Sequence, residues 1–210
     1  SIARESDAVI YTQAGSEIGV ASTKAYTSQL VALYLLMLQL AQIKWTLSPE
    51  ELQAKLDDLK SIPAKIETVL EQNARIQDIA RRYASSKDYI YIGRGFDFPT
   101  ALEGALKMKE ISYIHATGYA AGELKHGPIA MIDERVRVVC IATKGFWYEK
   151  MVSNIEEVKA RKGKLIIVAT EGDSALAKLA DDIIWVPPVA EDLTPIVTVV
   201  ASSLPSGAVA

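Results

Sequence analysis

The sequence is poor in the residues that build disulfides and metal sites. Its 210 residues include one cysteine, Cys140, and two histidines. A single cysteine cannot form an internal disulfide, which fits a protein of the reducing cytoplasm. So few nitrogen and sulfur ligands argue against a structural zinc site. Because Cys140 lies in a mostly apolar run, we expect it to be a small buried hydrophobic residue.

Excess positive charge and a long apolar run are also missing. The net charge of -3 argues against a nucleic-acid surface, which needs a basic stripe. The N-terminus has neither the apolar core of a signal peptide nor an initiator methionine, so we expect the chain to begin within a longer protein. The most apolar stretch, residues 30–43, contains Gln39 and Gln42 and is shorter than the roughly 20 residues of a membrane span. We therefore expect a buried core helix there and no membrane partner.

Half of the residues are hydrophobic, enough for a sizeable core, and from residue 88 onward short apolar runs alternate with amphipathic segments. Such alternation is typical of a parallel sheet covered by helices on both faces, which makes the predicted fold class α/β. The predicted strands are 89–92, 136–142, 165–169 and 182–186, and the predicted helices are 99–114, 148–161 and 174–180.

The flanking segments differ in kind. Residues 8–11 read as a short buried strand, and a helix is predicted from about residue 22 to residue 44. Residues 45–87 have apolar side chains at helical spacing and predict two or three amphipathic helices. Residues 201–210 lack that spacing and carry two helix breakers, so we expect a frayed end.

One predicted helix carries a candidate catalytic group. Glu103, Lys107 and Glu110 are spaced i, i+4 and i+7 and share one helical face. They fit a solvated ladder of ion pairs. The functional alternative is a carboxylate base beside an ammonium, as the transfer of a proton between C1 and C2 of a sugar through an enediol requires.

The two histidines lie in different settings. His126 precedes Gly127 and Pro128, which predicts a loop, so it is either a surface histidine or a proton shuttle that titrates near neutrality. His115 is predicted to end an apolar helix and to interact with the helix dipole.

Two turns have the composition of a phosphate cradle. Residues 93–95, Gly-Arg-Gly, follow a predicted strand and precede a predicted helix, but they lack the longer glycine spacing of a dinucleotide site. Residues 19–24 precede a predicted helix, where simple helix capping explains them equally well.

Three longer motifs carry a resemblance to a known family. They are TQAGSEIGVASTKA at 12–25, ALEGALK through EISYIHA at 101–116, and AAGELKHGP at 120–128. In this order they resemble the isomerase half of the glutamine–fructose-6-phosphate aminotransferases, or glucosamine-6-phosphate synthases. The resemblance implies sugar-isomerase (SIS) domains, each a flavodoxin-like three-layer α/β/α unit.

The resemblance also implies a domain plan. Residues 1–44 are expected to be the C-terminal part of a first SIS domain, and residues 45–87 a helical linker. Residues 88–200 are expected to form a second SIS domain that is incomplete at its C-terminus, followed by a divergent tail at 201–210.

By the same resemblance, the parent enzyme converts fructose 6-phosphate and glutamine-derived ammonia to glucosamine 6-phosphate in hexosamine biosynthesis. It works as a cytoplasmic homodimer and needs no metal or organic cofactor. The implied residues are Glu110 as the base, Lys107 as its assistant, His126 of the neighbouring subunit for opening the sugar ring, and Val20, Ala21 and Ser22 as sugar contacts.

The sequence departs from the family pattern in three places. It has no glutaminase domain, no phosphate-gripping serine and threonine loop, and no Schiff-base lysine after residue 200. We therefore expect the isolated chain to be inactive and to bind sugar phosphate weakly. The alternative is a non-catalytic SIS module that binds a phosphosugar for regulation, although such a module has no need of Glu110, Lys107 and His126 together.

Overall fold

The computed structural model describes residues 2–18 and 21–209, and the side chains among these up to Ser203. The chain forms two compact units, Ser1–Asp57 and Asp58–Ala210. The second unit contains the sheet, the candidate catalytic helix and a cluster of buried hydrophobic residues.

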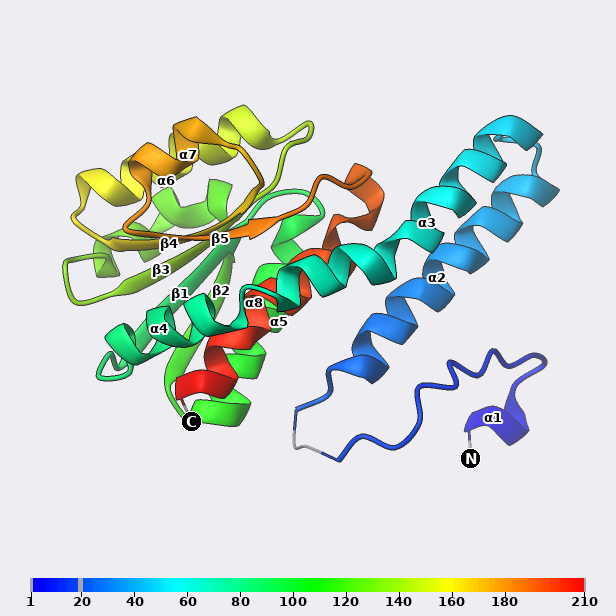
Figure 1. Cartoon of the computed structure of the whole chain (residues 1–210), viewed down its shortest axis with the longest axis horizontal. Helices are drawn as coiled ribbons and strands as arrows, with labels where there is room; N and C mark the ends of the chain where they lie inside the picture. The colour runs from blue at the N-terminus through cyan, green and yellow to red at the C-terminus, as the bar shows by residue number, and fades with distance from the viewer. Residues whose placement is uncertain (1, 19–20, 210) are drawn as a thin grey trace. The chain divides into compact units, whose positions relative to one another are not determined.

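The second unit is organised around a five-stranded parallel sheet in the order β2-β1-β3-β4-β5 (Figure 1). The strands are β1 (Asp88–Gly93), β2 (His115–Ala120), β3 (Arg137–Ala142), β4 (Lys164–Thr170) and β5 (Asp182–Val186). The α/β prediction is therefore confirmed. The switch in strand order between β1 and β3 is the arrangement found in flavodoxin-like folds.

Helices cover both faces of the sheet and make three layers. Figure 1 shows α6 (Tyr148–Ala160) and α7 (Ser174–Leu179) on one face. The other face is covered by α4 (Asn73–Tyr83), α5 (Asp97–Ser112) and α8 (Thr194–Val209). Three short 3₁₀ helices complete the unit: η1 (Ala121–His126), η2 (Pro128–Met131) and η3 (Glu191–Leu193).

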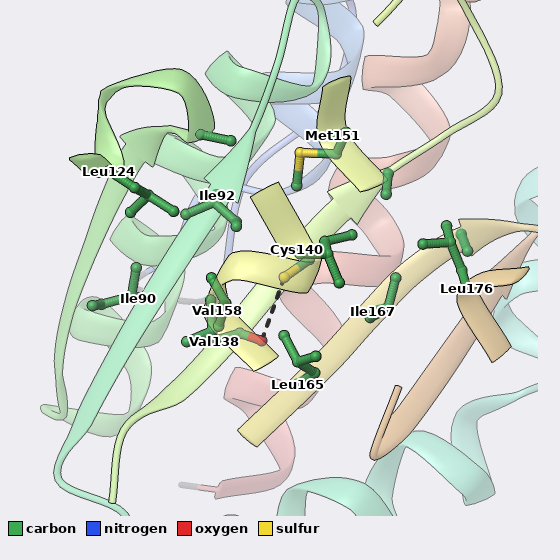
Figure 2. Packing of buried hydrophobic residues seen from close by; sticks show 14 of the residues in the cluster. Ile90, Ile92, Leu124, Val138, Cys140, Met151, Val158, Leu165, Ile167 and Leu176 are labelled. Carbon is green, nitrogen blue, oxygen red and sulfur yellow. Dashed lines mark hydrogen bonds between the residues drawn. The ribbon is translucent and has the colours of Figure 1, made fainter. Parts of the chain in front are cut away.

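The core under α6 and α7 is made of alternate strand residues, as the pleat of a sheet requires. Ile92, Cys140 and Ile167 come from neighbouring strands and are fully buried (Figure 2). The prediction for Cys140 is confirmed, and burial raises the pKa of its thiol well above the usual value. Burial of this kind keeps the thiol protonated and unreactive.

The helical segment before the sheet forms as predicted. It consists of α3 (Pro49–Leu70), with Pro63 inside the helix, and α4. The side chain of Gln72 joins this segment to β5 through two hydrogen bonds with the backbone of Trp185. The buried carboxylate of Asp182, at the start of β5, accepts a hydrogen bond of 2.7 Å from the Tyr83 hydroxyl and pairs with Arg82 at 2.8 Å.

Two predictions are wrong for the N-terminal unit. Residues 8–11 form no strand, and Val9, Ile10 and Tyr11 are exposed. Helix α2 (Lys24–Ile43) forms over the predicted range, but it is not a buried core helix, since only Tyr34 and Leu38 of its residues, all described, are buried. Its apolar composition therefore predicted the helix but not its burial. By length and composition alone α2 could cross a membrane, a test that core helices of soluble proteins also pass.

Two further predictions are wrong in the second unit. His115 does not end a helix but begins β2, a strand missed in a polar, glycine-containing segment, and its Nδ1 lies 3.0 Å from Asp88 of β1. The segment after residue 200 is not frayed, since α8 continues to Val209. Ala201 and Ser202 are buried, so packing overrides the weak helical pattern of this segment.

Replacing Tyr83 with phenylalanine tests the attachment of α4 to β5. The Tyr83→Phe protein should lose about 1–2 kcal/mol of unfolding free energy, because the buried Asp182 carboxylate loses a charge-assisted hydrogen bond. Urea unfolding measures this. Tyr113→Phe, at an exposed tyrosine, is the control and should leave the stability unchanged. Equal stability of all three proteins would show that the bond contributes nothing.

Candidate functional site

Helix α5 lies unusually close to the sheet and to α8 at Gly104. A Cβ at this position would lie 2.8 Å from a ring carbon of the buried Tyr91 in β1 and 3.3 Å from the Cβ of Ser202 in α8. Glycine therefore allows the close approach that holds α5 against both elements. This packing fixes the helix face on which Glu103, Lys107 and Glu110 stand.

Lys107 is a buried ammonium between two carboxylates. Its Nζ lies 3.1 Å from Oε1 of Glu103 and 2.8 Å from Oε2 of Glu110. The exposed fraction is 3% for the Lys107 side chain, 13% for Glu103 and 32% for Glu110. The solvated-ladder alternative therefore fails, since the central cation is out of water, and Glu110 is the more exposed of its two carboxylate partners.

Two opposing effects act on the ammonium of Lys107. Burial disfavours its charged form, but its hydrogen bonds to Glu110 and Glu103 outweigh burial and hold the pKa of Lys107 above its usual value. The lysine is therefore charged at neutral pH. It is a fixed positive charge beside Glu110 rather than a free amine.

His126 lies at the end of the 3₁₀ helix η1 and not in an irregular loop, and its side chain is 74% exposed. Its role as a proton shuttle stays a prediction. Its described ionic partner is Glu123, with Nε2 and Oε2 3.9 Å apart. No described interaction joins His126 to Lys107 or Glu110, so the structure does not bring the three predicted catalytic residues together within one chain.

The predicted sugar contacts belong to the N-terminal unit. Ala21 is buried and Ser22 is half-buried in the approach to α2, while Val20 lies outside the described residues. Glu17, which the sequence did not single out, organises this segment. Its Oε2 accepts hydrogen bonds from the backbone amides of Thr23 and Ala25, and the bond from Ala25 is the main cause of the lowered pKa of Glu17.

The turn at residues 93–95 lacks the free positive charge that a phosphate cradle needs. The next helix, α5, begins with Asp97, whose buried Oδ2 accepts hydrogen bonds from the amide and hydroxyl of Thr143. Burial raises the pKa of Asp97. The arginine of the turn, Arg94, donates a hydrogen bond of 2.8 Å to Oδ1 of Asn154 instead of standing free.

The largest groove among those described lies elsewhere. It has a volume of about 940 Å³ and follows the amino ends of β1, β2 and β3, so Lys107 and Glu110 do not line it. Within residues 2–18 and 21–209, no group of three or more His, Cys, Asp or Glu side chains is placed to hold a metal ion.

Replacing Lys107 with methionine tests the charge arrangement. The variant should lose about 2–3 kcal/mol of unfolding free energy at pH 8, because Glu103 and Glu110 lose their shared cation in a largely buried site. Chemical unfolding at pH 8 and in alkali measures it.

Lys109→Met, at an exposed lysine of the same helix, is the control and should cost little at either pH. In the unsubstituted protein, the charge of Lys107 contributes fully to stability below the usual lysine pKa of 10.5. Because the pKa of Lys107 is raised, this contribution is lost only in alkali, as the pH rises through the raised pKa. A Lys107→Met deficit that does not depend on pH would contradict the arrangement.

The SIS domain family matches residues 1–39 and 82–209 of the chain. The chain is 51% identical over 204 residues to a glutamine–fructose-6-phosphate aminotransferase [isomerizing] of Thermus thermophilus, and 49% identical over 204 residues to that of Methanosarcina mazei. These matches cover 97% of this chain but 34% and 33% of the relatives. The chain thus spans about a third of the length of the curated relatives it matches.

Solved structures agree with the sequence relatives. The C-terminal domain of glucosamine-fructose-6-phosphate aminotransferase from Francisella tularensis superposes with a TM-score of 0.94 at 38% identity, over 99% of this chain and 58% of that one. A putative tagatose-6-phosphate ketose/aldose isomerase from Clostridium novyi, with a TM-score of 0.76 at 19% identity, shares the fold. The resemblance predicted from the motifs is confirmed, and the chain belongs to the SIS domain family.

Proposed function

We propose that this chain is the part of an isomerising glutamine–fructose-6-phosphate aminotransferase that carries the isomerase helix. The observation that carries the proposal is the buried Lys107 ammonium, which holds the partly exposed carboxylate of Glu110 at 2.8 Å. The relatives of about 50% identity, named for this reaction, support it. The substrate is then fructose 6-phosphate, and the product of the whole enzyme is glucosamine 6-phosphate.

The chemistry follows from the two groups. Glu110 takes the proton from one of the carbons C1 and C2 of the open-chain sugar and returns it to the other. The charged Lys107 stabilises the negative charge that develops on the enediol and orients the carboxylate of Glu110. Glu103, 3.1 Å from the other side of the ammonium, holds Lys107 in place.

His126 has a separate role in this proposal. It belongs to a neighbouring subunit of a homodimer and assists opening of the sugar ring. Its high exposure supports a role toward a partner, since the imidazole is presented outward. Ala21 and Ser22, with Val20, contact the sugar, and the enzyme works in the cytoplasm.

A hybrid enzyme tests the proposal. The 204 matching residues of the Thermus thermophilus relative are replaced by those of this chain, and formation of glucosamine 6-phosphate from fructose 6-phosphate and glutamine is measured. The hybrid should be active. Glu110→Gln in the hybrid should lower kcat by about 100-fold or more, because the general base is lost, while KM for fructose 6-phosphate stays nearly constant.

Glu156→Gln, at an exposed glutamate of α6, is the matched control and should leave kcat unchanged. Full activity of the Glu110→Gln hybrid would contradict the role of Glu110. A hybrid that folds as stably as the relative but makes no product would contradict the proposed function itself.

A further inference from the structure

Three separate contacts hold η1, the short helix that ends in His126, to the body of the domain. The first is hydrophobic. Leu124 and Ala121 are fully buried in the core, and Figure 2 shows Leu124 beside Ile92 of β1. The exposed Glu123 and His126 are therefore carried by a segment whose apolar residues point inward.

The second contact is the guanidinium of Arg94, which lies directly against Gly122. A Cβ at residue 122 would lie 3.2 to 3.4 Å from Nη1, Nη2 and Cζ of Arg94. The same guanidinium donates a hydrogen bond of 2.8 Å to the buried Asn154 of α6, and its Cζ lies 5.4 Å from the centre of the Trp147 ring. Arg94 is thus held by Asn154 and Trp147, and its guanidinium lies close to Gly122 of η1.

The third contact is an ion pair between η1 and α6. Nζ of Lys125 lies 2.9 Å from Oε1 of Glu157. Asn154 and Glu157 are three residues apart and so lie on the same face of α6. This face of α6 therefore contacts η1 in two ways. Asn154 holds Arg94 close to Gly122, and Glu157 pairs directly with Lys125.

We infer that Arg94 is a positioning residue that holds η1, and with it His126, in a fixed place for the reaction. The inference rests on the proposed role of His126. Without the guanidinium, Gly122 loses its support and Asn154 loses its partner, while the Leu124 anchor remains. The 3₁₀ hydrogen bonds of η1 are intrinsically weak, so the segment depends on such outside contacts.

Hydrogen exchange on the 210-residue chain tests the positioning without any activity. Arg94→Met should lower the protection of the amides of residues 122–126 by about tenfold, which corresponds to the loss of one hydrogen bond to a buried partner. The protection of the amides of β4 should stay unchanged. Arg94→Lys, which keeps the charge but not the planar fork, should restore only part of the protection. Arg135→Met, at an exposed arginine paired with Asp133, is the control.

Two exchange results would overturn the inference. Unchanged protection of η1 in Arg94→Met would show that Leu124 and Lys125 suffice. Loss spread equally over η1 and β4 would show that Arg94 supports the fold as a whole.

The hybrid enzyme tests whether the positioning of His126 by Arg94 matters for the reaction. Arg94→Met should lower kcat about tenfold, and this effect should vanish in a His126→Ala background, since Arg94 acts through His126. Additive effects would contradict the inference. An inactive hybrid whose η1 exchange behaves as expected would count against the proposed function while supporting the positioning of η1 by Arg94.

Discussion

The site depends on one buried positive charge. An ammonium removed from water costs several kcal/mol unless carboxylates surround it. Lys107 has one carboxylate on each side, at 3.1 and 2.8 Å, so the cost is offset by charge pairing. The consequence is a carboxylate, Glu110, that is oriented by a fixed positive charge and is partly exposed to solvent. A general base needs both properties.

The rest of the second unit serves to place this charge. Gly104 lets α5 lie against Tyr91 and Ser202, and the parallel sheet beneath gives the helix a rigid support. The 3₁₀ segment that carries His126 is fixed in a different way, by a core leucine and by the guanidinium of Arg94. The α5 helix, which carries Lys107 and Glu110, and the 3₁₀ helix η1, which carries His126, are thus held in place by separate sets of contacts.

Local patterns predicted much of this architecture. The alternation of apolar and amphipathic segments predicted four of the five strands, and the spacing of Glu103, Lys107 and Glu110 predicted their common face. The spacing could not predict burial of Lys107, because that depends on how α5 packs. Strand β2 was missed because residues 115–120, HATGYA, have little apolar alternation, and its pairing with β1 supplies the stability.

The other errors have the same origin in tertiary structure. The buried Ala201 and Ser202 extend α8 although their local sequence disfavours a helix. The apolar residues of α2 predicted a core helix, yet most of them are exposed in the unit that contains them. Arg94 could not have been recognised from the sequence as a support for η1, since its partners Gly122 and Asn154 are 28 and 60 residues away along the chain.

The most direct test of the central claim is to observe Glu110 while the sugar binds. In the hybrid enzyme with ¹³C-labelled glutamate side chains, fructose 6-phosphate is titrated and the carboxyl resonances are followed by NMR. The account predicts that the Glu110 resonance shifts saturably with substrate, whereas the resonance of the exposed Glu156 stays in place. A Glu110 resonance that does not move while the sugar is bound would contradict it.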